Sequence, residues 1–186
     1  MSVGINVPNL ITLFRIFMVP LIIWLIVSGE FLAAFLVFVL AGVSDAVDGF
    51  IAKRFGLTTE LGAYLDPIAD KLLLVSIYVS LGLRNILPAW LVILVVSRDI
   101  LIIGAFLLSW MLDKPVRVTP LMVSKANTTV QIVLAATVLG TLGFGVELAD
   151  LIWVLIVAVA AFTVLSAAAY LRLWLIHMAN GDGLEL

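Results

Sequence analysis

Four aspartates stand close together in a chain that is otherwise strongly apolar. Asp45 and Asp48 are three positions apart, and Asp66 and Asp70 are four positions apart. Residues with these spacings lie on one face of a helix, so each pair would present two carboxylates in the same direction. A short link between the two helices would then bring all four carboxylates to one place.

Four neighbouring carboxylates cannot all stay ionised without a counter-charge. Two divalent cations can supply it, and ligation by oxygen alone suits Mg²⁺, Mn²⁺ or Ca²⁺ rather than zinc. Gly49 follows Asp48, and Gly62 precedes Asp66; glycine at such positions lets a ligand approach the backbone closely. The pattern predicts a metal site that also holds a substrate. The alternative is two helix ends that carry ordinary solvated acids.

The composition excludes an ordinary soluble domain. Of the 186 residues, 65% are hydrophobic and 12% are charged, and the mean hydropathy is +1.31. A helix needs about 20 apolar residues to cross a bilayer, which leaves room for roughly six crossings. The absence of cysteine excludes disulfides, a thiolate nucleophile and cysteine-ligated zinc, and no basic tract indicates a nucleic-acid partner. We therefore predict an all-α integral membrane protein whose first apolar run is retained rather than cleaved.

Polar and glycine- or proline-containing breaks divide the chain into six apolar spans. They are expected at residues 10–27, 31–52, 61–83, 88–112, 121–144 and 151–176. The links are short, so consecutive helices are expected to be antiparallel neighbours in one six-helix transmembrane bundle. A polar link is expected over 53–60 and a frayed tail at the C-terminus. Residues 1–186 are expected to form a single domain.

Basic residues fall mostly on one side of this arrangement. The links and ends on that side carry Lys53, Arg54, Lys114, Arg117, Lys125 and Arg172, whereas the opposite links carry Arg84 together with Glu30, Glu147 and Asp150. Cytoplasmic loops are enriched in lysine and arginine. Both termini and the four aspartates are therefore expected on the cytoplasmic side.

The aspartate stretch resembles the signature of the CDP-alcohol phosphatidyltransferases, D-x-x-D-G-x-x-A-R-x8-G-x-x-x-D-x-x-x-D. The matching positions are Asp45, Asp48, Gly49, Ala52, Gly62, Asp66 and Asp70. The one departure is Lys53 in place of the family arginine, with Arg54 directly after it. The opening of the chain is similar to a second family pattern, N-x-x-T-x-x-R, at Asn9, Thr12 and Arg15. The resemblance covers nearly the whole chain.

This resemblance implies transfer of a phosphatidyl group from CDP-diacylglycerol to an alcohol, with release of CMP. It implies two Mg²⁺ or Mn²⁺ ions, with Ca²⁺ as an inhibitor, bound by Asp45, Asp48, Asp66 and Asp70. Asp70 is also the expected base that takes the proton of the alcohol. The CDP-lipid is expected to contact Asn9, Thr12, Asp48, Gly49, Ala52, Lys53, Arg54 and Gly62. Lys53 can neutralise a pyrophosphate but cannot make the planar two-pronged contact of an arginine.

The acceptor alcohol is expected at a basic site formed by Arg98, Lys125 and Arg15. A charge inside a span should face a cavity or a partner, so Arg98 either binds an anionic acceptor or pairs with an acid on another helix. The stretches SRDILII (97–103) and VSKANTTVQIVLAA (123–136) resemble the cardiolipin synthase branch, whose acceptor is phosphatidylglycerol. The alternative is the phosphatidylglycerophosphate synthase branch, whose acceptor is glycerol 3-phosphate; the inositol and serine branches fit less well.

Two further expectations concern the setting of the protein. Family members are often homodimers, so the resemblance implies a homodimer surrounded by membrane lipids, in the bacterial inner membrane with its active site facing the cytoplasm. An ion-coupled transporter is the alternative from another class. It is disfavoured because the acids gather at one membrane face rather than at the midplane, where transporters bind their ions.

The metal assignment is tested by Asp66→Asn, which removes one charge at almost unchanged side-chain size. We expect the variant to be extracted from membranes as a folded protein that no longer releases CMP from CDP-diacylglycerol. EDTA should stop the wild type in the same way, and added Mn²⁺ or Mg²⁺ should restore it. Near-normal turnover of the variant, or activity after complete metal removal, would contradict the metal site.

Overall fold

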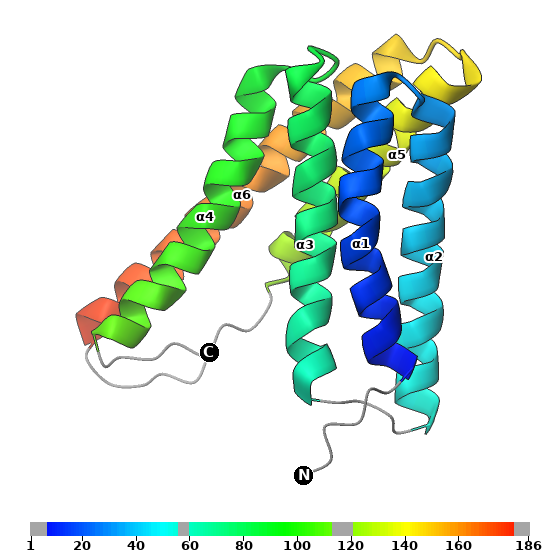
Figure 1. Cartoon of the computed structure of the whole chain (residues 1–186). Helices are drawn as coiled ribbons and strands as arrows, with labels where there is room; N and C mark the ends of the chain where they lie inside the picture. The colour runs from blue at the N-terminus through cyan, green and yellow to red at the C-terminus, as the bar shows by residue number, and fades with distance from the viewer. Residues whose placement is uncertain (1–6, 56–59, 113–120, 181–186) are drawn as a thin grey trace. The chain divides into compact units, whose positions relative to one another are not determined.

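The computed structural model describes residues 7–55, 60–112 and 121–180, and it describes side chains over 14–47, 68–105, 107–112 and 121–178. This part of the chain consists of helices joined by turns, which confirms the all-α prediction. The helices are α1 (Val7–Ser28), α2 (Phe31–Phe55), α3 (Glu60–Leu83), α4 (Ala89–Met111), α5 (Met122–Phe144) and α6 (Ala149–Asn180) (Figure 1).

Each expected span coincides with one helix, and most boundaries differ by only a few residues. The extent of the polar link between the second and third helices was wrong, because α2 continues to Phe55 and α3 begins at Glu60. Lys53 and Arg54 are therefore helical. The link was placed at these residues because they are polar. Lysine and arginine are good helix formers, however, so the helix continues through them. The expected link at 113–120 and the tail after residue 180 lie outside the described residues.

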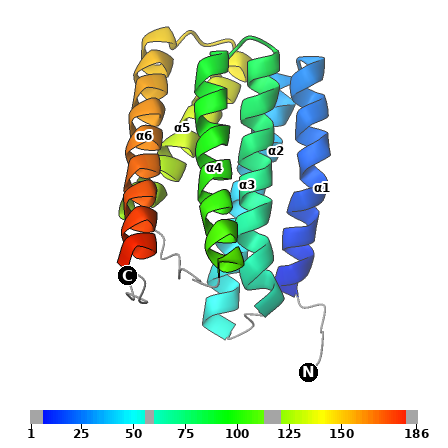
Figure 2. The ribbon, with the colours of Figure 1, turned by 90° about the vertical axis from the view of Figure 1, so that its left-hand side faces the viewer.

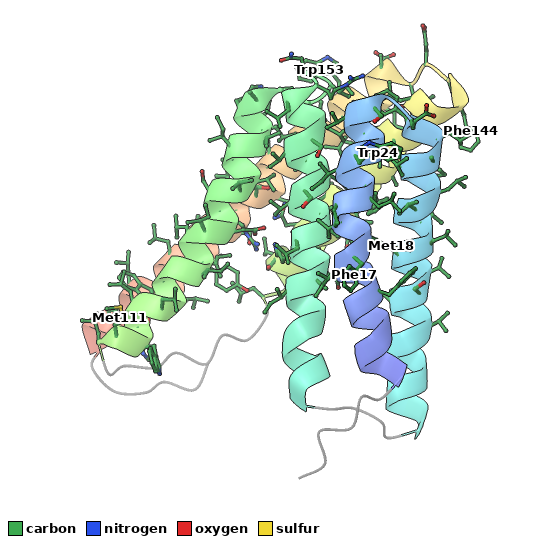
Figure 3. The ribbon with its side chains drawn as sticks, in the orientation of Figure 1. Phe17, Met18, Trp24, Met111, Phe144 and Trp153 are labelled. Carbon is green, nitrogen blue, oxygen red and sulfur yellow. The ribbon has the colours of Figure 1, made fainter. Side chains whose placement is uncertain are left out.

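The apolar character of the helices supports a membrane protein. Within the described residues, three helices are long and apolar enough to cross a bilayer, namely Ala89–Met111, Met122–Phe144 and Ala149–Met178. Two shorter apolar helical segments cover Phe14–Ser28 and Phe31–Val47. Large apolar side chains are exposed, among them Phe17, Trp24, Met111, Phe144 and Trp153 (Figure 3). In a soluble protein such a surface would promote association, whereas lipid tails accommodate it.

The chain divides into two compact units. Unit 1 comprises Met1–Leu87 and Ala135–Leu148, and unit 2 comprises Pro88–Leu134 and Ala149–Leu186. In unit 1, α1 packs against both α2 and α3, around side chains with no exposed surface such as Ile22, Ile26, Ile77 and Leu81. In unit 2, α4 packs against α6.

The direction of the helices in unit 1 decides which residues can meet. α1 and α3 run in the same direction, and α2 runs in the opposite direction between them in sequence (Figures 1 and 2). The beginning of α1, the end of α2 and the beginning of α3 therefore lie at one end of the unit. This is the end that carries the aspartate signature.

At the opposite end of unit 1, three helices terminate with the same backbone geometry. Each has one residue in the left-handed conformation: Gly29 after α1 (φ 83°), Asn85 after α3 (φ 56°) and Gly145 after α5 (φ 68°). The next amide donates to a carbonyl five residues back, as in Glu30 N to Leu25 O at 2.9 Å, Ile86 N to Leu81 O at 3.0 Å and Val146 N to Thr141 O at 3.0 Å. This Schellman arrangement satisfies carbonyls that the helix leaves unpaired.

A close approach of backbones joins the end of α5 to the beginning of α2 in unit 1. A Cβ atom built on Gly143 would lie 2.8 Å from the Cα atom of Leu32. One turn away, Phe35 and Phe144 meet edge to face, with ring centroids 5.7 Å apart. Only glycine fits at position 143, because the atom in the way belongs to the backbone and cannot rotate aside.

We expect Gly143→Ala to lower the unfolding midpoint, because overpacking a tight contact costs about 1–3 kcal/mol, more than alanine gains in helix propensity. The measurement is thermal unfolding of the detergent-solubilised protein followed by tryptophan fluorescence. Gly42→Ala in α2 is the matched control, since a Cβ there meets no atom within 4 Å. If both variants have the same midpoint, the contact is not as tight as described.

Candidate active site

One arginine and two aspartates meet at the signature end of unit 1. Arg15 of α1 lies between Asp45 of α2 and Asp70 of α3: its Nη2 is 2.5 Å from Asp45 Oδ1, and its Nη1 donates to Asp70 Oδ1 at 2.6 Å. By the rise of a helix, each of the three lies about two to three turns from the nearby helix end. Three helices thus bring three charges to one level.

The three side chains differ in their exposure. The side chain of Arg15 is only 2% exposed, whereas those of Asp45 and Asp70 are 43% and 50% exposed. A buried guanidinium is tolerated when carboxylates pair with it. The two carboxylates, by contrast, keep surface through which a ligand can reach them.

The guanidinium of Arg15 is not fully satisfied by this pairing. Its Nε is buried and has no hydrogen-bond partner among the described residues. Leaving a buried donor without an acceptor costs about 1–3 kcal/mol. Arg15 is therefore held by two ion pairs, of which the one through Nη1 is also a hydrogen bond, while its Nε contacts no acceptor among the described residues.

The predicted convergence of the aspartates can be followed for two of the four. Asp45 and Asp70, the first and last aspartates of the signature, share one cation although they lie on different helices. Asp48 and Asp66 belong to α2 and α3, but their side chains lie outside the described residues. Among the side chains that are described, no group of three potential metal ligands occurs. The donor set still fits a hard divalent cation, because the two carboxylates approach close enough to hold one positive group between them.

The residues expected to bind the CDP-lipid occupy the same ends of the same helices. Asn9 and Thr12 lie in α1, Gly62 lies in α3, and the remainder, Asp48, Gly49, Ala52, Lys53 and Arg54, lie in α2. Their side chains fall outside the described part of the chain, so their contacts stay predictions.

A second buried arginine lies in unit 2. Arg98 of α4 is 4% exposed. It donates to Asp99 Oδ1 at 2.6 Å, to Ser124 Oγ of α5 at 2.6 Å, and to Ser166 Oγ of α6 at 2.6 Å through Nη2 and 3.2 Å through Nε. The guanidinium also stands over the ring of Tyr170, 5.7 Å from its centroid. These contacts connect α4 with α5 and α6 within unit 2.

Arg98, Asp99, Ser124 and Ser166 form what we call the Arg98 cluster. The sequence left two roles open for Arg98, binding of an anionic acceptor or pairing with an acid, and the cluster is closer to the second. Arg98 has a carboxylate partner, as the pairing alternative required, but the acid is its neighbour in α4 rather than a residue of another helix. Lys125, the other half of the expected basic pair, is exposed. Arg15, the third expected acceptor residue, is engaged with Asp45 and Asp70 in unit 1.

Hydroxyl partners from α5 and α6 were missed from the sequence. Beside the cluster, the hydroxyl of Thr163 donates to Asn127 Oδ1 at 3.0 Å. Ser124 and Asn127 are three apart on α5, as are Thr163 and Ser166 on α6. Polar residues at this spacing in apolar helices share one face. That pattern was the available signal for a polar seam between α5 and α6.

Comparison with known proteins places the chain in a family. The model of the CDP-alcohol phosphatidyltransferase family matches residues 5–165. The chain belongs to this family, and the assignment made from the aspartate signature is confirmed. The family depends in general on divalent metal ions.

Curated relatives of two kinds are similar to the chain. The chloroplastic CDP-diacylglycerol–glycerol-3-phosphate 3-phosphatidyltransferase 1 of Oryza sativa subsp. japonica is 38% identical over 89% of this chain and 56% of its own length. The cardiolipin synthase (CMP-forming) of Homo sapiens is 35% identical over 89% of this chain and 60% of its own length. The CDP-diacylglycerol–glycerol-3-phosphate 3-phosphatidyltransferase of Shigella flexneri serotype 5b is 37% identical over 91% of this chain and 90% of its own length. The chain therefore spans less than two thirds of the rice and human proteins, but nearly all of the Shigella protein.

We expect Arg98→Ala to destabilise the protein strongly, because it removes the buried cation that contacts Asp99, Ser124 and Ser166, and breaking a buried pair costs about 3–5 kcal/mol. Lys125→Ala is the comparison, since this lysine is exposed and its loss should change the unfolding midpoint little. Thermal unfolding in detergent measures both. Equal, small shifts would contradict the structural role of the Arg98 cluster.

Proposed function

We propose that this protein transfers a phosphatidyl group from CDP-diacylglycerol to an alcohol and releases CMP. The observation that carries the proposal is the meeting of Asp45 and Asp70 at one buried cation, at the end of the unit where the family signature begins and ends. Membership of the family supports the same reaction. The names of the rice, human and Shigella relatives all describe enzymes of this kind.

The proposed reaction is a nucleophilic displacement at phosphorus. The alcohol oxygen attacks the phosphorus that carries the diacylglycerol, the bond from this phosphorus to the CMP oxygen breaks, and CMP leaves with the electron pair. Asp70 takes the proton of the alcohol in this proposal, since its side chain is half exposed and can be reached by a substrate. Lys53 and Arg54 are the cations proposed to hold the pyrophosphate.

A divalent metal pair fits the proposed site. Asp45, Asp48, Asp66 and Asp70 would hold Mg²⁺ or Mn²⁺, which would neutralise phosphate charge where it develops in the transition state. Positioning supplies much of the remaining catalysis in phosphoryl transfer. In this chain, positioning falls to α1, α2 and α3, which carry every residue of the proposed metal and CDP-lipid sites.

For the acceptor we favour phosphatidylglycerol, which would give cardiolipin. The specific observation is the pairing of Arg98 with Asp99 Oδ1 at 2.6 Å. This acid offsets the charge of the arginine, so a phosphodiester with one negative charge suits the surroundings better than the phosphate dianion of glycerol 3-phosphate. Lys125 is exposed and can add a second cation. Glycerol 3-phosphate is the second candidate because two of the relatives named above carry it in their names.

The setting we propose is a bilayer crossed by all six helices, with both termini and the aspartates on the cytoplasmic side of a bacterial inner membrane. The apolar helices found among the described residues support it, as does the concentration of lysine and arginine at one side. Small residues in α6, including Ala160, Ala161 and Ala168, suit the close contact of a homodimer.

The test is to supply the purified full chain with CDP-diacylglycerol, Mn²⁺ and each acceptor, first separately and then together. We expect cardiolipin to form faster than phosphatidylglycerophosphate, with one CMP released per product. The products are separated by mass spectrometry, and Asp66→Asn is the inactive control. Phosphatidylglycerophosphate as the only product would overturn the acceptor but not the reaction. No CMP release with any alcohol would overturn the reaction itself.

A further inference from the structure

Arg15 pairs with two of the aspartates that are proposed to bind metal. Its guanidinium contacts Asp45 and Asp70 through one oxygen of each, at 2.5 and 2.6 Å. Both aspartates are proposed metal ligands. A cation of the protein therefore occupies positions at which the proposed function requires cations from solution.

We propose that Arg15 is the built-in counter-charge of the metal-free site, and that divalent cations compete with it for Asp45 and Asp70. The inference rests on the proposed metal-dependent function, because it assigns Arg15 a role toward the same carboxylates. It differs from the acceptor-binding role that the sequence alone suggests for this residue.

The charges of Asp45 and Asp70 favour such a competition. Without a counter-charge, two neighbouring carboxylates on separate helices would repel each other and push the ends of α2 and α3 apart. Arg15 prevents this in the absence of metal, because two of its nitrogens hold one carboxylate each. Once Mn²⁺ or Mg²⁺ is bound, the same guanidinium is a like charge at short range, and its repulsion weakens the binding of the metal.

The burial of Arg15 points the same way. Arg15 is almost fully enclosed, and its Nε has no acceptor within the described part of the chain. Buried donors are normally hydrogen-bonded, and all three side-chain nitrogens of the enclosed Arg98 in unit 2 donate. In the proposal, the Nε of Arg15 is the donor available to a new partner. When metal takes the aspartates, an anionic substrate oxygen is a suitable new acceptor for the guanidinium.

The experiment measures Mn²⁺ binding to the detergent-solubilised full chain, with free Mn²⁺ followed by electron paramagnetic resonance and protein stability followed by thermal unfolding. In Arg15→Gln we expect a lower unfolding midpoint without metal and Mn²⁺ binding tighter by about tenfold, because one nearby positive charge has been removed. Saturating Mn²⁺ should reduce the difference in midpoint between the variant and the wild type.

Two further variants separate this role from general stabilisation. Arg15→Lys keeps a cation but cannot bridge two carboxylates with two nitrogens, so its Mn²⁺ affinity should fall between those of wild type and Arg15→Gln, and it serves if the glutamine variant does not fold. Arg84→Gln is the matched control. Arg84 also binds in unit 1, to the carbonyl oxygen of Val27 at 3.1 Å, so its loss should lower stability and leave Mn²⁺ affinity unchanged.

The outcomes distinguish the inference from the function on which it rests. Unchanged or weaker Mn²⁺ binding in Arg15→Gln, in a protein whose wild type binds Mn²⁺, would overturn the competition and leave the metal-dependent transferase standing. If the wild type binds no Mn²⁺ and releases no CMP, both proposals fail together.

Discussion

A charge enclosed by apolar helices needs a counter-charge within the protein, and this requirement determines which helices pack together around Arg15 and around Arg98. In unit 1, Arg15 is enclosed and its acids are open; in unit 2, Arg98 and Asp99 are both enclosed. The cost of a lone buried ion is far larger than the gain from most single contacts. The helices that supply partners are therefore fixed relative to the arginine in each unit.

The two arginines meet this constraint in different ways, with different chemical consequences. Arg98 uses a neighbouring acid and two hydroxyls, and those partners leave its charge largely offset. Arg15 uses two acids that are also the proposed metal ligands, so under the proposal its pairing changes when metal binds. Arg98 links α4 to α5 and α6 and carries an offset charge toward the proposed acceptor, whereas Arg15 contacts the proposed metal ligands.

The helices and the position of the aspartates could be predicted from the sequence because both depend on local spacing. Apolar runs between Gly29, Pro88 and similar breaks predicted six helices, and the signature aspartates Asp45 and Asp70 meet at one end of unit 1 as expected. The shared faces of Asp45 with Asp48 and of Asp66 with Asp70 stay predictions. The partner of the acids could not be predicted, since Arg15 meets Asp70 only through the packing of α1 on α3. The pairing of Arg98 with Asp99 was also not expected, because adjacent residues of a helix do not face each other. The long, flexible arginine side chain can nevertheless reach the neighbouring carboxylate.

Arg15 also has a consequence for how the chain is made. Proteins are synthesised from the N-terminus, so α1 leaves the ribosome before α2 and well before α3. Its arginine then has neither Asp45 nor Asp70 to pair with, although an enclosed arginine needs a counter-charge. Both ion pairs of Arg15 can therefore form only after α3 has been synthesised. The packing of α1 against α2 and α3 is thus completed by residues that are made last of the three helices.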